Sequence, residues 1–496
     1  MSTTSEPQAE SETVQAESVA GVAAVIVLAA GGGTRMKSAK SKLLHEIAGR
    51  PLIGHAINAA EQLRSDHLVV VVGVMADQVE PALAQIAPNV TVVHQTDDAY
   101  GTGHAVRCAM NELGDDLHGE VVVTLGDAPL LTGATLERFV AQHRAEDNAI
   151  TVLSAHVPHP TGYGRIVRDS VGQVQRIVEH KDATDAERGI DEINSGLFVF
   201  DADVLRDGLS KLTTDNVQGE YYLTDLPAIA QAQGQRVGAH VTSDLWEVEG
   251  VNTRSQLSAV GKELNRRICE KWMLAGVTIV DPATTWIQTD VDLAPDVTLL
   301  PGTSLEGATV VGTGSTIGPD TTLTDVEVAE NATVCRTHGS LAVIGSGVTV
   351  GPFAYLRPGT VLDTDAHVGT FVELKNAHVG AGAKVPHLTY VGDAEIGEGA
   401  NIGAGTIFAN YDGVHKHHST VGKNSFVGSD SVLVAPVNVA DGAYVAAGSA
   451  VTEDVGVGEL GIARGRQHNS SGWVVRNRAG SKTAEAAEAA GEQRSE

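Results

Sequence analysis

The sequence predicts two folded parts, a mostly parallel α/β sheet in the first half of the chain and a parallel β-helix in the second half. Three observations support this prediction. Short runs rich in Val and Ile alternate with amphipathic segments, which is the pattern of strands connected by helices. From Ile344 onward an aliphatic residue recurs about every sixth position, which is the period of a stacked coil. The chain contains 55 glycines but only 4% aromatic residues, which suits small aliphatic cores with many tight corners.

Composition and charge narrow the class of protein. The 496 residues leave room for two or three domains with cores of their own. A net charge of −28 argues against general binding to nucleic acids or to anionic membranes. The three cysteines, Cys108, Cys269 and Cys335, lack metal-binding spacing, and we expect them to be reduced, buried thiols of a cytoplasmic protein.

Neither end of the chain indicates a membrane or export segment. Residues 1–20 lack the basic region that begins a signal peptide. The longest early apolar run, Val22–Ala30, is too short to cross a bilayer. We expect residues 1–20 and 475–496, which are polar and of low complexity, to be disordered.

The α/β part is expected to span residues 21–252. Its predicted strands, AAVIVLAAG, HLVVVVGV and EVVVTLGDAPLL, end in Gly or Asp, and amphipathic segments lie between them at Pro51–Arg64 and Gly103–Leu113. In such a sheet, ligands bind at the carboxyl ends of the strands. A connecting helix over residues 253–275 is predicted by the helical spacing of Leu257, Val260, Leu264 and Ile268.

A glycine-rich loop follows the first predicted strand. The chain reads LAAGGGTRM from Leu28 to Met36, and KLLH follows from Lys42. Glycines at this place let backbone N–H groups approach a phosphate or a base, and Arg35 and Lys42 add positive charge. The loop is neither a dinucleotide fingerprint, because Met36 stands where the third glycine belongs, nor a P-loop, because it lacks GK[ST].

These residues closely resemble the signature of the sugar-nucleotide pyrophosphorylases, whose Rossmann-like α/β fold is a nucleotidyltransferase domain. The resemblance implies that Arg35 and Lys42 are catalytic residues that neutralise the phosphates of UTP. It also implies contacts to UTP or its sugar product from Ala29, Ala30, Gly31, Gln95, Gly101 and Thr102. Three positions depart from the pattern. Ser41 replaces a proline and loosens the loop, Gln95 lies one residue further from the glycines, and Leu125 replaces a tyrosine.

Further matches imply a metal site and a sugar pocket. Asp127 follows a strand, and Asn252 closes the string VEGVN; the resemblance makes these two residues the metal ligands. We expect Mg²⁺, because an all-oxygen site beside phosphates favours a hard cation. The resemblance also implies a pocket for N-acetylglucosamine formed by Gly164, Glu179, Asn194 and Asn252, with Tyr222 and Thr224 in its wall.

The chemistry follows from these assignments. An oxygen of a sugar 1-phosphate attacks the α-phosphorus of UTP, and pyrophosphate leaves in line. Because two polyanions have to meet, positioning and charge neutralisation carry the catalysis. The attacking phosphate is already ionised, so the reaction needs no general base.

Hexads such as IGSGVT, VGPFAY and LRPGTV predict a β-helix over residues 276–474. Three hexads make one triangular coil, so residues about eighteen positions apart stack on each other. Arg357 and Lys375 form such a pair, and two stacked cations repel unless they share an anion such as a sugar phosphate. The hexads resemble the left-handed hexapeptide-repeat family, many of whose members are acyltransferases.

The stretch HLTYVGDAEIG, which begins at His387, resembles the glucosamine-1-phosphate acetyltransferase motif, although Val385-Pro386 replaces small residues. The resemblance implies that His387 is the general base that takes a proton from the substrate amine. It implies that glucosamine 1-phosphate is bound by Arg357, Lys375, Tyr390 and Asn401. The backbone N–H of Ala404 is expected to stabilise the oxyanion.

A polar loop, residues 408–420, interrupts the hexads, and we expect its histidines, His415, His417 and His418, to be solvated. The resemblance implies that this loop approaches the substrate of a neighbouring subunit. The residues expected at the acetyl-CoA site are Ala404, Asn410, Tyr411, Lys416, Ser429, Ala447 and Arg464. Trp473 is expected to fold onto an adjacent site.

Across residues 22–474 the chain resembles the bacterial bifunctional N-acetylglucosamine-1-phosphate uridylyltransferases/glucosamine-1-phosphate acetyltransferases. The resemblance implies a homotrimer that makes UDP-N-acetylglucosamine, a precursor of the bacterial cell wall, from glucosamine 1-phosphate, acetyl-CoA and UTP. Two alternatives stay open at this point. The β-helix could be only an assembly or regulatory module of a single-activity nucleotidyltransferase, or the chain could be a non-catalytic binding subunit.

Overall fold

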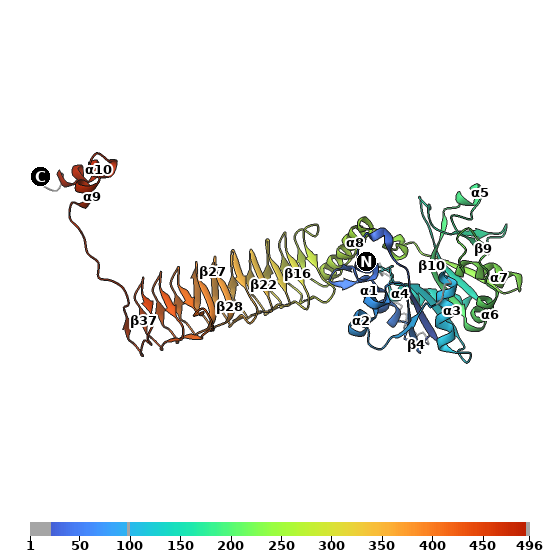
Figure 1. Cartoon of the computed structure of the whole chain (residues 1–496), viewed down its shortest axis with the longest axis horizontal. Coiled ribbons are helices and arrows are strands. Elements are labelled where there is room, and N and C mark those ends of the chain that lie inside the picture. The colour runs from blue at the N-terminus through green and yellow to red at the C-terminus, as the bar shows by residue number, and fades with distance from the viewer. Residues whose placement is uncertain (1–20, 97–99, 493–496) are drawn as a thin grey trace, which may run out of the picture. The chain divides into compact units, whose positions relative to one another are not determined.

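The computed structural model describes residues 21–96 and 100–492, which form two compact units (Figure 1). The first unit contains the described residues up to Leu274 together with Trp286–Val291, and the second contains Ala275–Thr285 and the described residues from Asp292 onward. The expectation of disorder for residues 1–20 lies outside the described residues. No helix within the described ranges is both long enough and apolar enough to span a membrane.

The first unit is built on a nine-stranded sheet with the order β11-β7-β10-β6-β1-β4-β5, to which β8 and β9 add a hairpin through β10. β1 lies in the middle and runs parallel to both β4 and β6. β10 runs antiparallel to its neighbours β6 and β7, so the sheet is mixed at this place. The strands are β1 (Ala24–Ala29), β4 (His67–Val72), β5 (Thr91–His94), β6 (Glu120–Leu125), β7 (Ile150–His156), β8 (Arg165–Arg168), β9 (Val174–Val178), β10 (Glu192–Asp201) and β11 (Val237–Val241).

Helices cover both faces of this sheet, because successive side chains of a strand point to opposite faces. Ala24 and Ile26 of β1 pack into one buried cluster with α3, α6 and α7, whereas Val25 and Val27 pack into the other with α1, α2 and α4. These continuous apolar strands therefore need cover on both sides. The helices are α1 (Leu52–Glu61), α2 (Ala76–Ile86), α3 (Thr102–Leu113), α4 (Gly133–Ala145), α6 (Ala202–Lys211) and α7 (Leu226–Ala232).

The connecting helix predicted over residues 253–275 is α8 (Arg254–Leu274). Val260 is buried against Ile47 and Leu52, and Leu257 and Leu264 pack on the same cluster. The predicted apolar stripe therefore holds α8 on the first unit. Asn265 also accepts a hydrogen bond from the backbone N–H of Ile287, which helps to place Trp286–Val291 with this unit.

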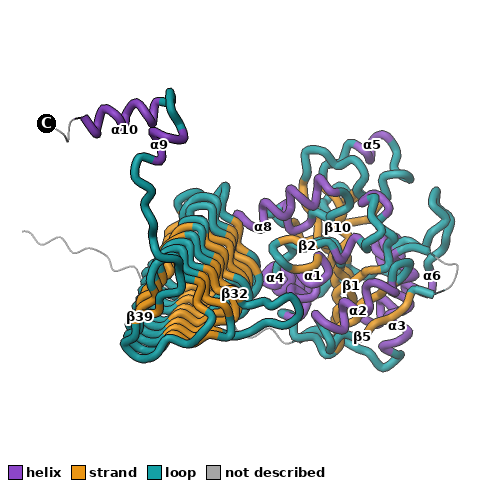
Figure 2. The backbone as a smooth tube through the Cα atoms, turned by 60° about the vertical axis from the view of Figure 1, so that its left-hand side comes forward, coloured by secondary structure: helices purple, strands orange, loops and turns teal. Residues whose placement is uncertain are grey.

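The second unit is a parallel β-helix whose strands lie in register from coil to coil (Figure 2). Each regular coil gives one strand to an eleven-stranded sheet and two to a seventeen-stranded sheet, which together form three faces. This is the architecture predicted from the hexads. One interior column of the eleven-stranded sheet consists of Ile317, Val334, Val350, Val368, Val385, Ile402, Val427 and Val445, all buried.

Two details of the second unit differ from the sequence-based expectation. The polar interruption does not begin at Phe408, because that side chain is buried inside β32 (Ile407–Ala409), and the exposed part of the loop starts at Tyr411. The described part of the segment expected to be disordered carries α10 (Lys482–Glu492), after α9 (Trp473–Asn477). Trp473 is about half exposed and lies under the guanidinium of Arg478.

Candidate functional site

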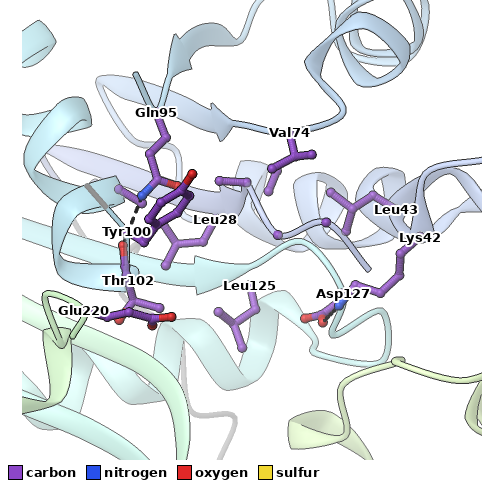
Figure 3. Close-up of a pocket in the computed structure, with 16 residues that line it drawn as sticks. Leu28, Lys42, Leu43, Val74, Gln95, Tyr100, Thr102, Leu125, Asp127 and Glu220 are labelled. Atoms are coloured by element: carbon purple, nitrogen blue, oxygen red, sulfur yellow. Dashed lines mark hydrogen bonds and ion pairs between the residues drawn. The ribbon is translucent and has the colours of Figure 1, made fainter. Parts of the chain in front are cut away.

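The first candidate site is a cavity of about 370 Å³ at the carboxyl ends of β1 and β6 (Figure 3). Ala29, Ala30, Gly31, Gly32 and Lys42 line it on one side. A Cβ atom added at Gly31 or Gly32 would meet no protein atom within 4 Å, so the backbone of both residues faces open space. Both glycines are exposed at the cavity, and the contact of their N–H groups with a phosphate or a base stays a prediction.

Gln95, Gly101 and Thr102 also line this cavity. Gly101 has φ of 112°, and a Cβ atom there would lie 2.3 Å from the carbonyl oxygen of Tyr221. The Nε2 atom of Gln95 donates a hydrogen bond to the carbonyl oxygen of Gly101 at 3.2 Å. The shifted Gln95 is therefore still part of the cavity wall, beside the glycine that starts α3.

Lys42, Asp127 and Asn252 meet at the edge of the cavity. The Nζ atom of Lys42 lies 2.5 Å from Oδ2 of Asp127 and 3.0 Å from Oδ1 of Asn252. Figure 3 shows Lys42 and Asp127 pointing toward each other. Asp127 follows β6 and Asn252 precedes α8, so two distant parts of the chain bring their oxygen atoms to one point.

The donor set fits a hard divalent cation. Two oxygen atoms, one from a carboxylate and one from an amide, lie within hydrogen-bond reach of a single position that now holds an ammonium group. Mg²⁺ is commonly held by one or two such protein ligands and completed by phosphates and water. Among the residues that the structure describes, no cluster of three or more His, Cys, Asp or Glu side chains offers an alternative metal site.

The replacement of the expected proline by Ser41 does not leave the lysine loop unsupported. Ser41 is buried, and its backbone N–H, which a proline would lack, donates to Oε1 of Gln78 at 2.8 Å. Nε2 of Gln78 donates to the carbonyl oxygen of Ala39 at 2.9 Å. Lys40 pairs at the surface with Glu46, so Lys42 is the lysine that faces the cavity. The hydrogen bonds of Gln78 thus support the loop at the position where the proline is missing.

A second cavity of about 380 Å³ adjoins the first and shares Leu28, Thr102, Leu125 and Asp127 with it. The predicted sugar-pocket residues Gly164, Glu179 and Asn194 line it, together with Thr224, Asn252 and the exposed Arg35. Arg35 and Lys42 thus face different cavities. Tyr222 does not line the second cavity but is buried, with its hydroxyl 3.4 Å from Asp182.

Glu179 is one of two acidic residues that line this second cavity, with Asp127. Thr224 donates its hydroxyl to Oε1 of Glu179 at 3.0 Å. Burial raises the pKa of the Glu179 carboxyl, and the neighbouring carboxylates of Asp182 and Asp225 raise it further. A Cβ atom at Gly164 would lie 3.5 Å from both Glu179 and Asn194, so glycine keeps the pocket open between them.

A chain of hydrogen bonds that the sequence did not predict holds the Asn252 loop. Oε1 of Gln256 accepts from the backbone N–H groups of Asn252 at 3.0 Å and Thr253 at 3.1 Å. Nε2 of Gln256 donates to Glu249 at 3.0 Å, and Glu249 accepts from the hydroxyl of Tyr163 at 3.3 Å. Burial and the Glu249 carboxylate raise the pKa of Tyr163 to about 12.

The second unit gathers part of its predicted site around Asp393. This carboxylate accepts from Nδ2 of Asn376 at 2.9 Å and of Asn410 at 2.5 Å, and it pairs with Lys375 at 3.4 Å. Burial opposes the charged form of Asp393, but the two amides and the ammonium lower its pKa. The ammonium of Lys375 also lowers the pKa of Lys416 in the loop.

The stacked pair Arg357 and Lys375 differs from the prediction in one respect. Each cation has its own carboxylate, because Arg357 donates to Glu373 at 2.8 Å and Lys375 pairs with Asp393. A shared anion is therefore not needed to hold the two together. Tyr390 lies close by, since a Cβ atom at Gly392 would collide with the Tyr390 hydroxyl and the Asn410 amide.

The other predicted residues follow a different corner of the β-helix. His387 ends β29 (Lys384–His387) and is exposed, and its carbonyl oxygen accepts from Gly405, next to Ala404. The successive coils then stack through backbone bonds from Asp430 to Ala404 and from Gly448 to Ser429, and Arg464 donates to the carbonyl oxygen of Ala447 at 2.7 Å. Asn401 opens β31 (Asn401–Ile402), partly exposed. Tyr411 is exposed on the loop, and its hydroxyl donates to Gly413.

Among the loop histidines, His417 contacts a carboxylate of the same loop. Nε2 of His417 lies 2.7 Å from Asp412, which also accepts from the backbone of Val414 and His415. His415 and His418 are exposed. All three cysteines are thiols rather than disulfides; Cys269 is buried, whereas Cys108 and Cys335 are only partly buried, contrary to expectation.

Comparisons with known proteins match both units. The profile of the family described as the MobA-like NTP transferase domain matches residues 25–189. A protein of Kineococcus radiotolerans described as bifunctional protein GlmU is 55% identical over 471 residues, which cover 95% of this chain and 96% of that protein. Proteins with the same description from Streptomyces avermitilis and Corynebacterium efficiens are 54% and 52% identical, cover 94% of this chain, and are themselves covered to 97% and 96%.

Proposed function

The chain belongs to the family of bifunctional GlmU proteins, and from this premise we propose that it makes UDP-N-acetylglucosamine by two transfers, one on each unit. The second unit transfers an acetyl group from acetyl-CoA to glucosamine 1-phosphate. The first unit then joins the N-acetylglucosamine 1-phosphate to UTP and releases pyrophosphate. The similarity to bifunctional relatives over 95% of the chain supports both transfers, and the observation that carries the uridylyl transfer is the pair of adjoining cavities that share Asp127.

The uridylyl transfer uses both cavities. UTP lies in the first, with its phosphates against the open backbone of Gly31 and Gly32, and the sugar phosphate lies in the second. An oxygen of the sugar phosphate forms a bond to the α-phosphorus, and the bond from that phosphorus to the pyrophosphate oxygen breaks. Lys42 and Arg35, which face the two cavities, neutralise the phosphates as they approach each other.

Asp127 and Asn252 hold a divalent metal ion, for which we propose Mg²⁺. When bound, this ion supplies charge neutralisation to the phosphates that meet between the two cavities. The proposal is supported by the two oxygen atoms that converge on one position. Glu179 and Asn194 form hydrogen bonds with the sugar and its acetamido group. Gly164, which has no side chain, leaves room for the sugar.

The acetyl transfer takes place beside His387. The amine nitrogen of glucosamine 1-phosphate forms a bond to the thioester carbon of acetyl-CoA, the carbon–sulfur bond breaks, and coenzyme A leaves. The imidazole of His387 takes the proton that the amine loses. Arg357 and Lys375 bind the phosphate, while the coils that carry Ala404, Ser429, Ala447 and Arg464 bind acetyl-CoA.

A homotrimer completes the acetyl-transfer site. Three large apolar side chains stand exposed at one corner of successive coils, Phe353 at 53%, Phe371 at 58% and Leu388 at 61%. The two phenylalanine rings stack with centroids 5.4 Å apart. An exposed apolar ridge of this kind marks a protein contact. Because Leu388 directly follows His387, a second copy packed on the ridge lies next to the proposed base.

The oligomer can be tested separately from the activity. Light scattering after size exclusion should give three times the chain mass for the native protein. Phe371→Asp, which places a charge on the ridge, should shift the protein toward the monomer and lower acetyl transfer. Val171→Asp, at a position 78% exposed in the first unit, serves as the matched control. A Phe371→Asp protein that stays trimeric would exclude this surface.

We place the enzyme in the cytoplasm and in the supply of precursors for the bacterial cell wall. The three cysteines are thiols, which agrees with a reducing compartment.

The overall function is tested with the purified chain, UTP and Mg²⁺. Given glucosamine 1-phosphate and acetyl-CoA, the protein should produce UDP-N-acetylglucosamine, detected by chromatography. If the protein forms the product from N-acetylglucosamine 1-phosphate but not from glucosamine 1-phosphate and acetyl-CoA, the chain catalyses only the uridylyl transfer. No product from either sugar would contradict the proposal for the first unit.

A further inference from the structure

The ammonium group of Lys42 stands where the metal ion of the proposed reaction belongs. It contacts Asp127 at 2.5 Å and Asn252 at 3.0 Å, and these are the two oxygen donors that the proposed function assigns to the metal. The side chains of Lys42 and Asp127 are only 11% and 17% exposed. Without a metal ion, the positive charge of Lys42 therefore neutralises the Asp127 carboxylate.

Lys42 and a divalent cation cannot occupy this place together. An ammonium group and a metal ion that share one carboxylate oxygen would lie within a few ångströms of each other, and water screens a buried pair poorly. One of the two positive groups has to leave when the other binds. The same argument gives Lys42 a destination, because it also lines the cavity of the glycine-rich loop, where the phosphates of UTP are expected.

The local backbone allows the side chain to change partners. Lys42 begins the short 3-10 turn η2 (Lys42–Leu44), and its Cβ atom packs on Gly33, where an added Cβ would lie 2.7 Å away. The base of the side chain is thus fixed, while its four-carbon stem can turn the ammonium from Asp127 toward the cavity. The hydrogen bonds of Gln78 hold the preceding residues in either case.

We propose that Lys42 is the built-in counter-ion of the metal site and that the phosphates of the nucleotide draw it away, so that metal and nucleotide bind cooperatively. This inference rests on the proposed function of the first unit. In the absence of nucleotide, Lys42 competes with the metal ion for Asp127 and Asn252. Once the ammonium lies on the phosphates, both oxygen atoms are released to the metal. By linkage, the metal also strengthens the binding of nucleotide by the same factor.

The test measures metal binding directly, with Mn²⁺ as the probe and its electron paramagnetic resonance signal as the readout. The variant is Lys42→Met, which keeps the stem on Gly33 but removes the charge. Without nucleotide, this protein should bind Mn²⁺ about tenfold more tightly than the native chain, a typical coupling between ligands. With saturating UTP the two affinities should lie closer together, because the native Lys42 has then left the site.

Three further proteins make the result decisive. Lys40→Ala removes a nearby lysine that pairs with Glu46 at the surface, and it should bind Mn²⁺ like the native chain. Asp127→Asn should not bind Mn²⁺ either with or without UTP. This loss would show that the ion binds at this site. Lys42→Ala repeats the charge removal with a shorter side chain, and the thermal unfolding of each variant reports whether it is folded.

The outcomes separate this inference from the proposed function. If Mn²⁺ binds with UTP and needs Asp127, but both Lys42 variants bind it no more tightly than the native chain without nucleotide, Lys42 is not a competitor and the inference is wrong. If Mn²⁺ binding does not depend on Asp127 in any state, the metal site itself is wrong, and the proposed function of the first unit loses its support.

Discussion

Two glycines of the first cavity, where we propose that UTP binds, illustrate how differently one residue type is used. Gly101 has φ of 112° and stands against the backbone of Tyr221, whereas Gly32 borders open space. Gly101→Ala should therefore lower the midpoint of thermal unfolding, because a side chain is strained at this φ and its Cβ has no room. Gly32→Ala should unfold like the native protein but raise the KM for UTP, because its methyl group enters the cavity. Equal effects of both changes on stability would contradict this assignment.

Glu179 gives a prediction about pH. Its pKa in the folded protein lies above the unfolded value, so the fold is favoured while the carboxyl is protonated and loses that contribution as the pH rises through the raised pKa. Glu179→Gln removes this cost. The midpoint of thermal unfolding should rise at pH 7.5 and should match the native protein near pH 4. The same variant should weaken the binding of N-acetylglucosamine 1-phosphate. A gain in stability that is independent of pH would point to another cause.

At the scale of one element, the start of α8 positions Asn252, the proposed metal ligand. Gln256 lies in the first turn of the helix and holds the backbone of Asn252 and Thr253. Gln256→Ala should lower Mn²⁺ affinity and kcat by about 10- to 100-fold, as the loss of a group that orients a ligand does. Ser258→Ala, at an exposed position of the same helix, should change neither quantity. An unchanged Mn²⁺ affinity in Gln256→Ala would show that the loop holds itself.

The elements also show what the sequence could predict. The strands that end in the site, β1 and β6, and the helix α8 were found from their apolar patterns, since those patterns reflect burial within one element. The antiparallel direction of β10 was not, because a buried run such as LFVF packs equally well in either direction. Gln78 supports a backbone group that is far away in the sequence, and Gln256 supports the backbone of an irregular loop. No spacing in the sequence reveals such contacts.

The regular hexads begin only at Ile344, although the β-helix was predicted from residue 276 and its first strand is β12 (Thr278–Ile279). The early coils have Thr, Asp and Pro at their corners. The number of residues in each of these coils varies from 16 to 18; for example, Thr316 pairs with Thr333, which pairs with Thr349. Their interior columns are nevertheless aliphatic. A pattern that tolerates such changes of length is visible only where several regular coils follow each other.

At the scale of the whole molecule, the proposed residues of each transfer come from one unit only. His387→Ala should lower the rate of acetyl transfer by at least about 100-fold, the loss typical of a general base, and should leave the rate of uridylyl transfer unchanged. Asp127→Asn should do the reverse. A mixture of the two variants should again convert glucosamine 1-phosphate into UDP-N-acetylglucosamine, because the intermediate can pass through solution. A mixture that stays inactive would mean that the two sites depend on each other.

The stacking of coils also makes length a quantity that can change in whole steps. Thr298 pairs with Thr316 in the next coil, so removal of residues 298–315 would bring equivalent positions together and shorten the column by one rung, about 4.8 Å. Every later side chain would keep its face. Removal of a single residue from within a strand would instead turn interior side chains of that strand outward, whereas a corner can absorb such a change, as the coils of 16 and 17 residues show. Evolution and protein engineering can therefore lengthen or shorten this unit by whole coils, and the faces of all later side chains stay the same.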